Sequence, residues 1–161
     1  MAKTERKRTD VTRRSAKALS TTRENAAQPA KPKRTAPASR SRKLPAEITR
    51  AVNAALDKKA HDVVILDLRS TPAFTDFFVL CSGLNQRQVK AIADGVEEAL
   101  RAAKLRPAHV EGYDRAEWIL MDYFSFIVHI FTPQTRAFYA LERLWGDAER
   151  IDVTEEQAKR A

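Results

Sequence analysis

The sequence contains a single cysteine and only four glycines, and it has no long apolar run. One cysteine cannot form an intramolecular disulfide, so nothing in the composition points to an oxidising compartment. The closest two glycines, Gly83 and Gly95, lie 12 positions apart, which excludes a Walker A loop and a G-x-G-x-x-G dinucleotide motif. No G-x-S-x-G nucleophile elbow occurs either. Because no run approaches the roughly 18 apolar residues that cross a bilayer, we expect no membrane span. We also expect a cytoplasmic location.

Acidic residues are scarce in the first 43 positions. Residues 1–43 hold 14 Lys/Arg and 3 Asp/Glu, a net charge of +11, whereas residues 44–161 hold 15 basic and 18 acidic residues, a net charge of −3. The first segment also lacks aromatic residues and contains three prolines. Such a segment buries too little apolar surface to offset its ordering entropy, so we predict a disordered basic arm at residues 1–43.

Three interpretations of the basic arm fit its composition. The first is an arm that neutralises phosphates of nucleic acid, with RNA as the favoured partner. The second is a solubilising extension without a specific partner. The third is an organellar transit peptide, which Glu5, Asp10 and Glu24 and the lack of an apolar helical face disfavour. We expect no secretory signal, because no apolar region follows the charged start.

Apolar residues recur at helical spacing in two segments after the arm. At 45–59, Ile48, Val52 and Leu56 repeat every four residues, and a stripe of similar period runs through 85–104. We predict an amphipathic helix in each segment.

A third helix is predicted near the end of the chain. Pro133 suits its first turn, and Phe138, Leu141 and Trp145 place an apolar stripe on it. The polar residues 154–161 are expected to fray.

Short apolar runs predict five strands of an α/β domain that spans residues 44–153. The runs lie at 63–66, 77–81, 108–111, 118–123 and 126–131. The last two are separated by about two residues, which predicts an antiparallel hairpin. The order of elements indicates a mixed sheet of about five strands flanked by helices.

Asp67 and Asp122 are the first candidates for catalysis, because each closes an apolar strand, where α/β folds often carry chemistry. A two-metal phosphoryl-transfer site needs carboxylates that converge on ions about 3.5–4 Å apart. A D-x-D pair would supply them, but each of these stretches contains one aspartate. We therefore favour capping of turns or pairing with a nearby arginine. The same applies to the other candidate carboxylates, Asp76, Asp94 and Glu111.

The three histidines give little support for a metal site. His61, His109 and His129 lie in separate segments without zinc-binding spacing. Cys81 follows an apolar run, and we expect a buried, inert thiol there. A Cys81 nucleophile paired with His109 or His129 is the alternative. No metal and no cofactor are predicted.

The predicted hairpin is unusually aromatic. Because side chains alternate along a strand, its aromatic residues fall on both faces, and some should lie outside the core. An exposed aromatic patch is typical of a protein interface. In the alternative, the final helix covers that face, and Trp118 packs on Phe138 or Leu141. The aromatic residues in question are Trp118, Tyr123, Phe124, Phe126 and Phe131.

Several strings, in this order, strongly resemble the ribosomal silencing factor family, also called the RsfS or Iojap family. The resemblance covers about residues 44–153 and leaves the basic arm outside. The strings are Asp76–Val79, Ser82-Gly83 with Gln86–Asp94, Glu111-Gly112, Trp118–Tyr123, Val128–Phe131 and Arg136–Trp145.

The resemblance implies a fold similar in topology to nucleotidyltransferases but without their catalytic carboxylates. It implies a protein that is not an enzyme and that binds the large ribosomal subunit at its fourteenth-numbered ribosomal protein. Bound there, such a protein blocks joining of the small subunit and lowers translation when nutrients are scarce. A monomer or weak homodimer is expected, with no membrane partner and with ribosomal RNA within reach of the arm.

Carried over residue by residue, the resemblance places partner contacts on the hairpin. The predicted contacts are Trp118, Asp122, Tyr123, Phe126 and His129, with Glu111 beside them. The chain departs from the family at Phe124-Ser125-Phe126, where the usual turn is Gly-Asp followed by an aliphatic residue, and at Lys104, where the family has glycine.

Two other classes of function are weighed against this one. A nucleotidyltransferase-like enzyme acting at Asp67 and Asp122 predicts tight binding of Mg²⁺ or nucleotide. A nonspecific RNA-binding protein predicts that the arm alone binds RNA as well as the full chain does.

Overall fold

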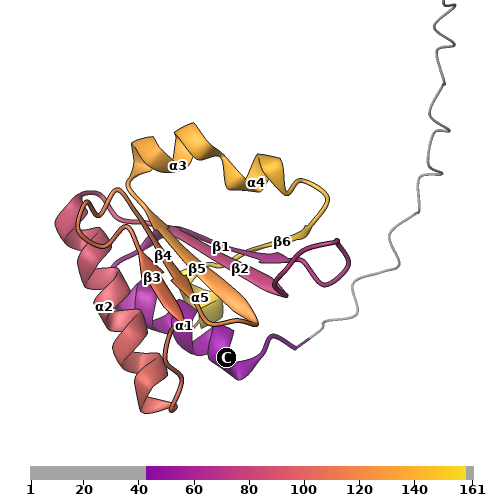
Figure 1. Ribbon diagram of the computed structural model, residues 1–161, viewed down its shortest axis with the longest axis horizontal. Helices are drawn as coiled ribbons and strands as arrows, with labels where there is room; N and C mark the ends of the chain where they lie inside the picture. The colour runs from indigo at the N-terminus through magenta and orange to yellow at the C-terminus, as the bar shows by residue number, and fades with distance from the viewer. Residues whose placement is uncertain (1–42, 159–161) are drawn as a thin grey trace, which may run out of the picture. The chain divides into compact units, whose positions relative to one another are not determined.

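The computed structural model describes residues 43–158, so all but the last residue of the predicted basic arm lies outside the described residues. Helices and strands are interspersed along this part of the chain (Figure 1). The elements are α1 (Ala46–Asp57), β1 (His61–Asp67), β2 (Phe77–Ser82), α2 (Gln86–Ala102), β3 (His109–Glu111), β4 (Trp118–Asp122), β5 (Phe126–Phe131), α3 (Pro133–Tyr139), α4 (Leu141–Leu144), β6 (Glu149–Asp152) and α5 (Glu155–Ala158).

The strands form one mixed sheet in the order β3-β4-β5-β2-β1-β6. Its central pair, β2 and β5, is parallel, and Phe77 lies opposite Phe126. The other neighbouring strands are antiparallel, including the predicted β4–β5 hairpin. The predicted α/β class with a mixed sheet is therefore confirmed.

The predicted sheet of about five strands gains a sixth, β6. It pairs antiparallel with β1, and Ile151 lies opposite Ile65. Three of its four residues are exposed, and Ile151 is its only apolar side chain. Such an edge strand is formed by ladder hydrogen bonds more than by burial, so it leaves no apolar alternation in the sequence.

The predicted final helix is divided into α3 and α4. Ala140 stands between them with φ 43°, in the left-handed region. This residue turns the chain, so the expected stripe is not continuous: Phe138 is 81% exposed, whereas Leu141 and Trp145 pack against the sheet. Neither glycine nor proline marks the break, which is why periodicity alone predicts one helix.

The two long helices cover one face of the sheet (Figure 1). Ile48, Ile92 and Leu100 from α1 and α2 are fully buried against alternate residues of the central strands. Burial of each such side chain contributes about 1.5–3 kcal/mol to stability. Asn85 accepts a hydrogen bond from the backbone N–H of Gln88 and so caps the start of α2.

The opposite face is covered by α3 and α4 (Figure 1), and Leu68 and Ala73 of the β1–β2 connection pack into its buried cluster. Its buried cluster is smaller and includes Phe78, Leu80 and Phe131. Within residues 43–158, no helix is both long and apolar enough to cross a membrane. The segment expected to fray begins with the short helix α5, and its last residues lie outside the described part.

Candidate partner-binding surface

Trp118, at the start of β4, is held by aromatic neighbours on the α3 side of the sheet. Its indole stacks on Phe131, with ring centroids 5.1 Å apart, and contacts Tyr139 of α3 at 4.6 Å. Its Nε1–H donates a hydrogen bond to Nδ1 of His129 over 3.1 Å. Trp118 is half-buried, so one part of the ring is fixed and another part faces solvent. The final helical segment thus contacts Trp118, as the second interpretation holds, through Tyr139.

A groove with a volume of about 460 Å³ opens beside this indole. Two of its aromatic side chains are strongly accessible: Phe138 is 81% exposed and Tyr139 is 48% exposed. Polar and charged side chains form the rest of its wall. We call it the aromatic groove; it is lined by Gly112, Arg115, Glu117, Trp118, Gln134, Thr135, Phe138 and Tyr139.

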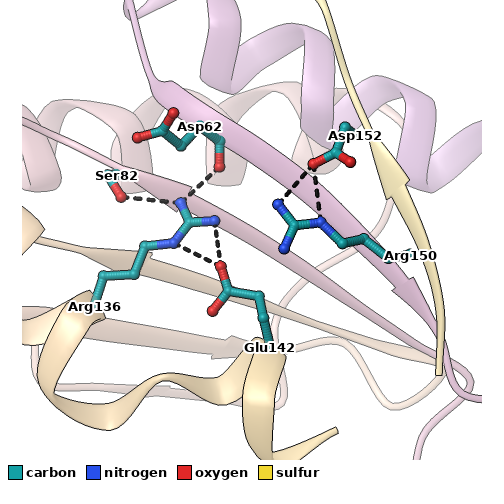
Figure 2. A network of polar contacts seen from close by, with 6 residues as sticks. All are labelled: Asp62, Ser82, Arg136, Glu142, Arg150 and Asp152. Carbon is teal, nitrogen blue, oxygen red and sulfur yellow. Dashed lines mark hydrogen bonds and ion pairs between the residues drawn. The ribbon is translucent and has the colours of Figure 1, made fainter. Parts of the chain in front are cut away.

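Arg136 ties α3, which carries these aromatic residues, to the sheet (Figure 2). Its Nη1 donates to the backbone carbonyl of Asp62 over 2.6 Å and to Oγ of Ser82 over 3.0 Å. Its Nε and Nη2 both donate to Glu142 of α4. A bulge between His61 and Val64 interrupts the β1–β2 ladder at Asp62, and Arg136 satisfies the carbonyl there.

The ion pair in this network is largely buried. The side chains of Arg136 and Glu142 are only 12% and 19% exposed. Burial opposes ionisation of Glu142, but the hydrogen bonds from Arg136 hold the pKa of this carboxyl below its usual value. By contrast, the neighbouring pair Arg150–Asp152 is open to solvent. The buried pair therefore fixes the position of α3 and α4, and the groove with it.

Gly112 forms a wall of the groove and has φ +77°, which side chains rarely allow. A Cβ at this position would lie 2.0 Å from the carbonyl oxygen of Trp118. Only glycine permits this approach of the β3–β4 connection to the start of β4. The glycine of the Glu111-Gly112 string is therefore required by its close contact with the backbone of Trp118.

The structure divides the six predicted contact residues between the two faces of the sheet. Tyr123 and Phe126 lie in the α1–α2 core, stacked with ring centroids 5.0 Å apart and 6% and 2% exposed. Trp118 and His129 lie on the α3 side. His129 is only 4% exposed. Tyr123 and Phe126 therefore do not share a surface with Trp118.

The two acidic residues of the predicted set remain accessible. Asp122 is half-exposed, and its Oδ1 accepts a hydrogen bond from the backbone N–H of Phe124 over 2.8 Å, so it caps the hairpin turn. Glu111 is exposed on β3, opposite Leu120. As direct contacts with a partner, the six residues stay a prediction.

The two exposed aromatic residues of the groove, Phe138 and Tyr139, are absent from the predicted contact set. Phe138 belongs to the apolar stripe predicted for the final helix, and packing of Trp118 on Phe138 is one of the two interpretations of the aromatic hairpin. The difference between a stripe that packs inward and an exposed Phe138 depends on Ala140. Its left-handed backbone ends α3, and the aromatic residues just before it remain accessible. That backbone state is not visible in the sequence.

Phe124 lies in the hairpin turn with φ +68° and is 77% exposed. This left-handed backbone region suits glycine and strains a bulky residue. The hydroxyl of Thr75 donates to the carbonyl oxygen of Phe124 over 3.1 Å, which ties the turn to the segment 68–76.

The two candidate catalytic aspartates do not converge. Asp67 accepts two hydrogen bonds from the guanidinium of Arg69, and Asp122 caps its turn, as the favoured interpretation holds. They lie on β1 and β4, which β2 and β5 separate, so about three strand spacings of 4.8 Å lie between them. Within residues 43–158, no group of three or more His, Cys, Asp or Glu side chains could hold a metal ion.

The alternative of a cysteine–histidine pair is not supported by the geometry. Cys81 is fully buried in the α1–α2 core, whereas His129 packs on the other face and His109 is exposed on the edge strand β3. Burial raises the pKa of the Cys81 thiol to about 12. The predicted buried thiol is confirmed, and at neutral pH it is not a thiolate.

A comparison with protein families decides the identity. The family described as "Ribosomal silencing factor during starvation" matches residues 41–161. The chain belongs to the ribosomal silencing factor family. The resemblance drawn from the motif strings is thereby confirmed.

Individual relatives agree with the family assignment. The chain is 40% identical over 103 residues to ribosomal silencing factor RsfS of Halalkalibacterium halodurans, covering 64% of this chain and 88% of that protein. It is 29% identical over 102 residues to the mouse protein named mitochondrial assembly of ribosomal large subunit protein 1, covering 62% of this chain and 45% of that one.

A solved structure supports the fold of this ribosomal silencing factor domain. A crystal structure of a protein from Chromobacterium violaceum matches with a TM-score of 0.61 and 32% identity, covering 62% of this chain and 83% of that chain.

Proposed function

We propose that this chain binds the large ribosomal subunit at its fourteenth-numbered ribosomal protein and blocks joining of the small subunit. Translation then falls when nutrients are limiting. Membership of the ribosomal silencing factor family supports this proposal, as does the name of the mouse relative, which refers to assembly of the large ribosomal subunit. We place this activity in the cytoplasm.

The aromatic groove is the observation that carries the proposal. Trp118, Phe138 and Tyr139 present aromatic surface that the chain does not use to fill its core. Aromatic anchors of this kind, with a polar rim around them, supply much of the binding energy at protein interfaces. Arg115 and Glu117 provide such a rim, with a distance of 3.8 Å between their charged groups.

A steric block requires no chemistry. A rigid domain seated on a surface that faces the other subunit prevents joining by overlap alone. The separation of Asp67 from Asp122 by two intervening strands favours this mechanism over a nucleotidyltransferase-like enzyme. We therefore propose no catalytic residue, cofactor or metal for this chain.

Charge supports a basic partner for the domain. Residues 44–161 carry a net charge of −3, which complements a basic ribosomal protein, whereas the +11 of residues 1–43 suits ribosomal RNA nearby. The charge of the arm also favours a second candidate function, nonspecific RNA binding. The two candidates differ in whether the groove is needed.

Co-sedimentation with purified large subunits, small subunits and joined ribosomes separates them. Wild type should be compared with Trp118→Ala and Phe138→Ala. Phe74→Ala is the matched control, because Phe74 is 77% exposed but does not line the groove. We expect pelleting with large subunits only, at least about ten-fold weaker in the two groove variants, as for interface hot spots.

Two outcomes would contradict the proposal. Equal pelleting with both subunits, insensitive to the groove variants and abolished by salt, would mean that the basic arm binds RNA nonspecifically. Loss of binding in Phe74→Ala as large as in Phe138→Ala would mean that the contact surface lies elsewhere. A subunit-joining assay with wild type and Trp118→Ala then tests the block itself.

A further inference from the structure

His129 is a buried polar residue among aromatic rings. It is 4% exposed, and its ring meets Phe78 edge-on, with centroids 4.7 Å apart. Phe131 and Trp118 lie on its other sides, with ring centroids at 6.0 Å and 5.8 Å. A partner that docks at the surface has no direct access to this side chain.

The protonation state of His129 follows from its one hydrogen bond. Nδ1 accepts from the indole Nε1–H of Trp118 over 3.1 Å, so Nδ1 carries no proton. The proton of the neutral ring is then on Nε2, which has no hydrogen-bond partner among residues 43–158. Burying a donor without a partner is unfavourable. The buried Nε2–H of His129 therefore lowers the stability of the domain, while Nδ1 accepts the hydrogen bond from Trp118.

The position of the His129–Trp118 hydrogen bond in the sheet explains its effect on the indole. Trp118 lies opposite Phe131 in the β4–β5 ladder, and His129 is two residues away on the same face, in the diagonal position. Phe131 and Tyr139 contact the indole through their rings, whereas His129 accepts the hydrogen bond from Nε1. Because only one edge of the indole carries a donor, this hydrogen bond gives the ring a preferred rotation.

We propose that His129 is a positioning residue, which holds the indole of Trp118 in the orientation that binds the large subunit. This inference rests on the proposed function, since it concerns the same groove. It differs from the expectation that His129 is itself a contact: the effect of His129 on binding passes through the Trp118 hydrogen bond.

Two substitutions separate an acceptor from a ring that only fills space. His129→Phe keeps an aromatic ring against Phe78 but removes the acceptor. His129→Gln keeps a side-chain oxygen that can accept from the indole. Binding to purified bacterial large subunits should weaken about ten-fold in His129→Phe, as when one buried hydrogen bond is lost, and should stay within about three-fold of wild type in His129→Gln.

The indole N–H signal of Trp118 in proton–nitrogen NMR gives a readout that a merely structural role would not move. Trp145, the second tryptophan, serves as the reference, and Trp118→Phe assigns the two signals. In His129→Phe we expect the Trp118 signal to shift toward that of a free indole and to exchange with solvent faster. In His129→Gln it should stay near its original position.

Acid provides the same test without a substitution. Protonation of Nδ1 puts a donor against the indole donor, so the Trp118 signal should move with the midpoint of the His129 ring signals. The side chains that pack on this ring from β2, β4 and β5 are Phe78, Trp118 and Phe131, and none of them titrates in acid. Because the carboxylate of Glu117 also lines the groove beside Trp118, the movement reports on His129 where its midpoint matches that of the His129 ring signals and it is absent in His129→Gln.

The outcomes distinguish this inference from the proposed function. Binding that is unchanged in Trp118→Ala would overturn the proposed groove, whatever the NMR signal shows. An unmoved indole signal in His129→Phe would overturn the positioning role. Equal weakening in His129→Phe and His129→Gln, with the indole signal unmoved in His129→Gln, would also overturn it and make His129 a contact or a packing residue.

Discussion

The face of the sheet under α1 and α2 is sealed by long helices and buried aliphatic side chains, whereas the face under α3 and α4 leaves aromatic side chains partly in solvent. Both faces are built from alternate residues of the same strands. The first face supplies most of the apolar burial that stabilises the domain. The second holds its aromatic residues with a few directed contacts, and so they remain available for a partner.

The largest contrast is expected between a core residue and a groove residue. Ile92→Ala, at a fully buried position of α2, should lower the free energy of unfolding by about 4 kcal/mol. Phe138→Ala should change it by less than about 0.5 kcal/mol, yet weaken binding to large subunits. Urea unfolding and co-sedimentation check the pair. Comparable losses of stability in both variants would remove the distinction between the faces.

The second largest effect is expected from the buried ion pair between Arg136 and Glu142 on the second face. Arg136→Met should destabilise the domain by about 2–3 kcal/mol, because it leaves Glu142 and the Asp62 carbonyl without their donor. Arg150→Met is the matched control, since it breaks a solvent-exposed pair in the same region and should change stability little (Figure 2). Thermal unfolding of the two variants measures this difference in stability. Similar midpoints would show that the buried network does not hold α3.

Acidification should weaken the second face through His129. Burial lowers the pKa of this imidazole to about 4, from about 6.5 in the unfolded chain. The unfolded state therefore binds the proton first, and stability present above pH 6.5 is lost as the pH falls toward 4, by up to about 3 kcal/mol. His129→Gln should lose less stability over this range. Parallel pH profiles for both proteins would contradict the assignment.

The smallest effect on the folded domain is expected from the basic arm. Deleting residues 2–43 should leave urea unfolding of the domain unchanged. We expect it to weaken binding to large subunits and make log K fall less steeply with log salt, because fewer phosphate counterions are released. Titrations at several salt concentrations check this. An unchanged slope would exclude a role of the arm in contacting ribosomal RNA.

Much of the first face could be predicted from the sequence. The runs that form β1, β2, β4 and β5 are apolar on both sides, and their boundaries shift by only one or two residues between prediction and structure. The edge strand β6 could not be predicted, since Ile151 is its only apolar residue and its partner is supplied by tertiary pairing. The local pattern of apolar residues indicates which side chains are buried, but it does not indicate which strands pair.

The candidate site was less predictable. Period-2 alternation predicts that the hairpin's aromatic residues divide between two faces, which is confirmed, but it does not tell which face the longer helices cover. For that reason Tyr123 and Phe126 were expected as contacts and are found in the core. Phe138 lies in the predicted stripe of the final helix but is exposed, because the left-handed backbone of Ala140 ends α3 and interrupts that stripe.

The parallel pairing of β2 with β5 has a consequence for how the domain is assembled. Phe77 and Phe126 are direct partners although α2, β3 and β4 lie between them in the chain, so this pairing closes a long loop. The β1–β2 pair closes a much shorter one and should form earlier. During synthesis, the centre of the sheet cannot form before β5 has emerged, and pulse-labelled hydrogen exchange should show β1–β2 amides protected before those of β4 and β5. A factor proposed to act on ribosomes thus completes its own sheet only after most of its chain has emerged from the ribosome that synthesises it.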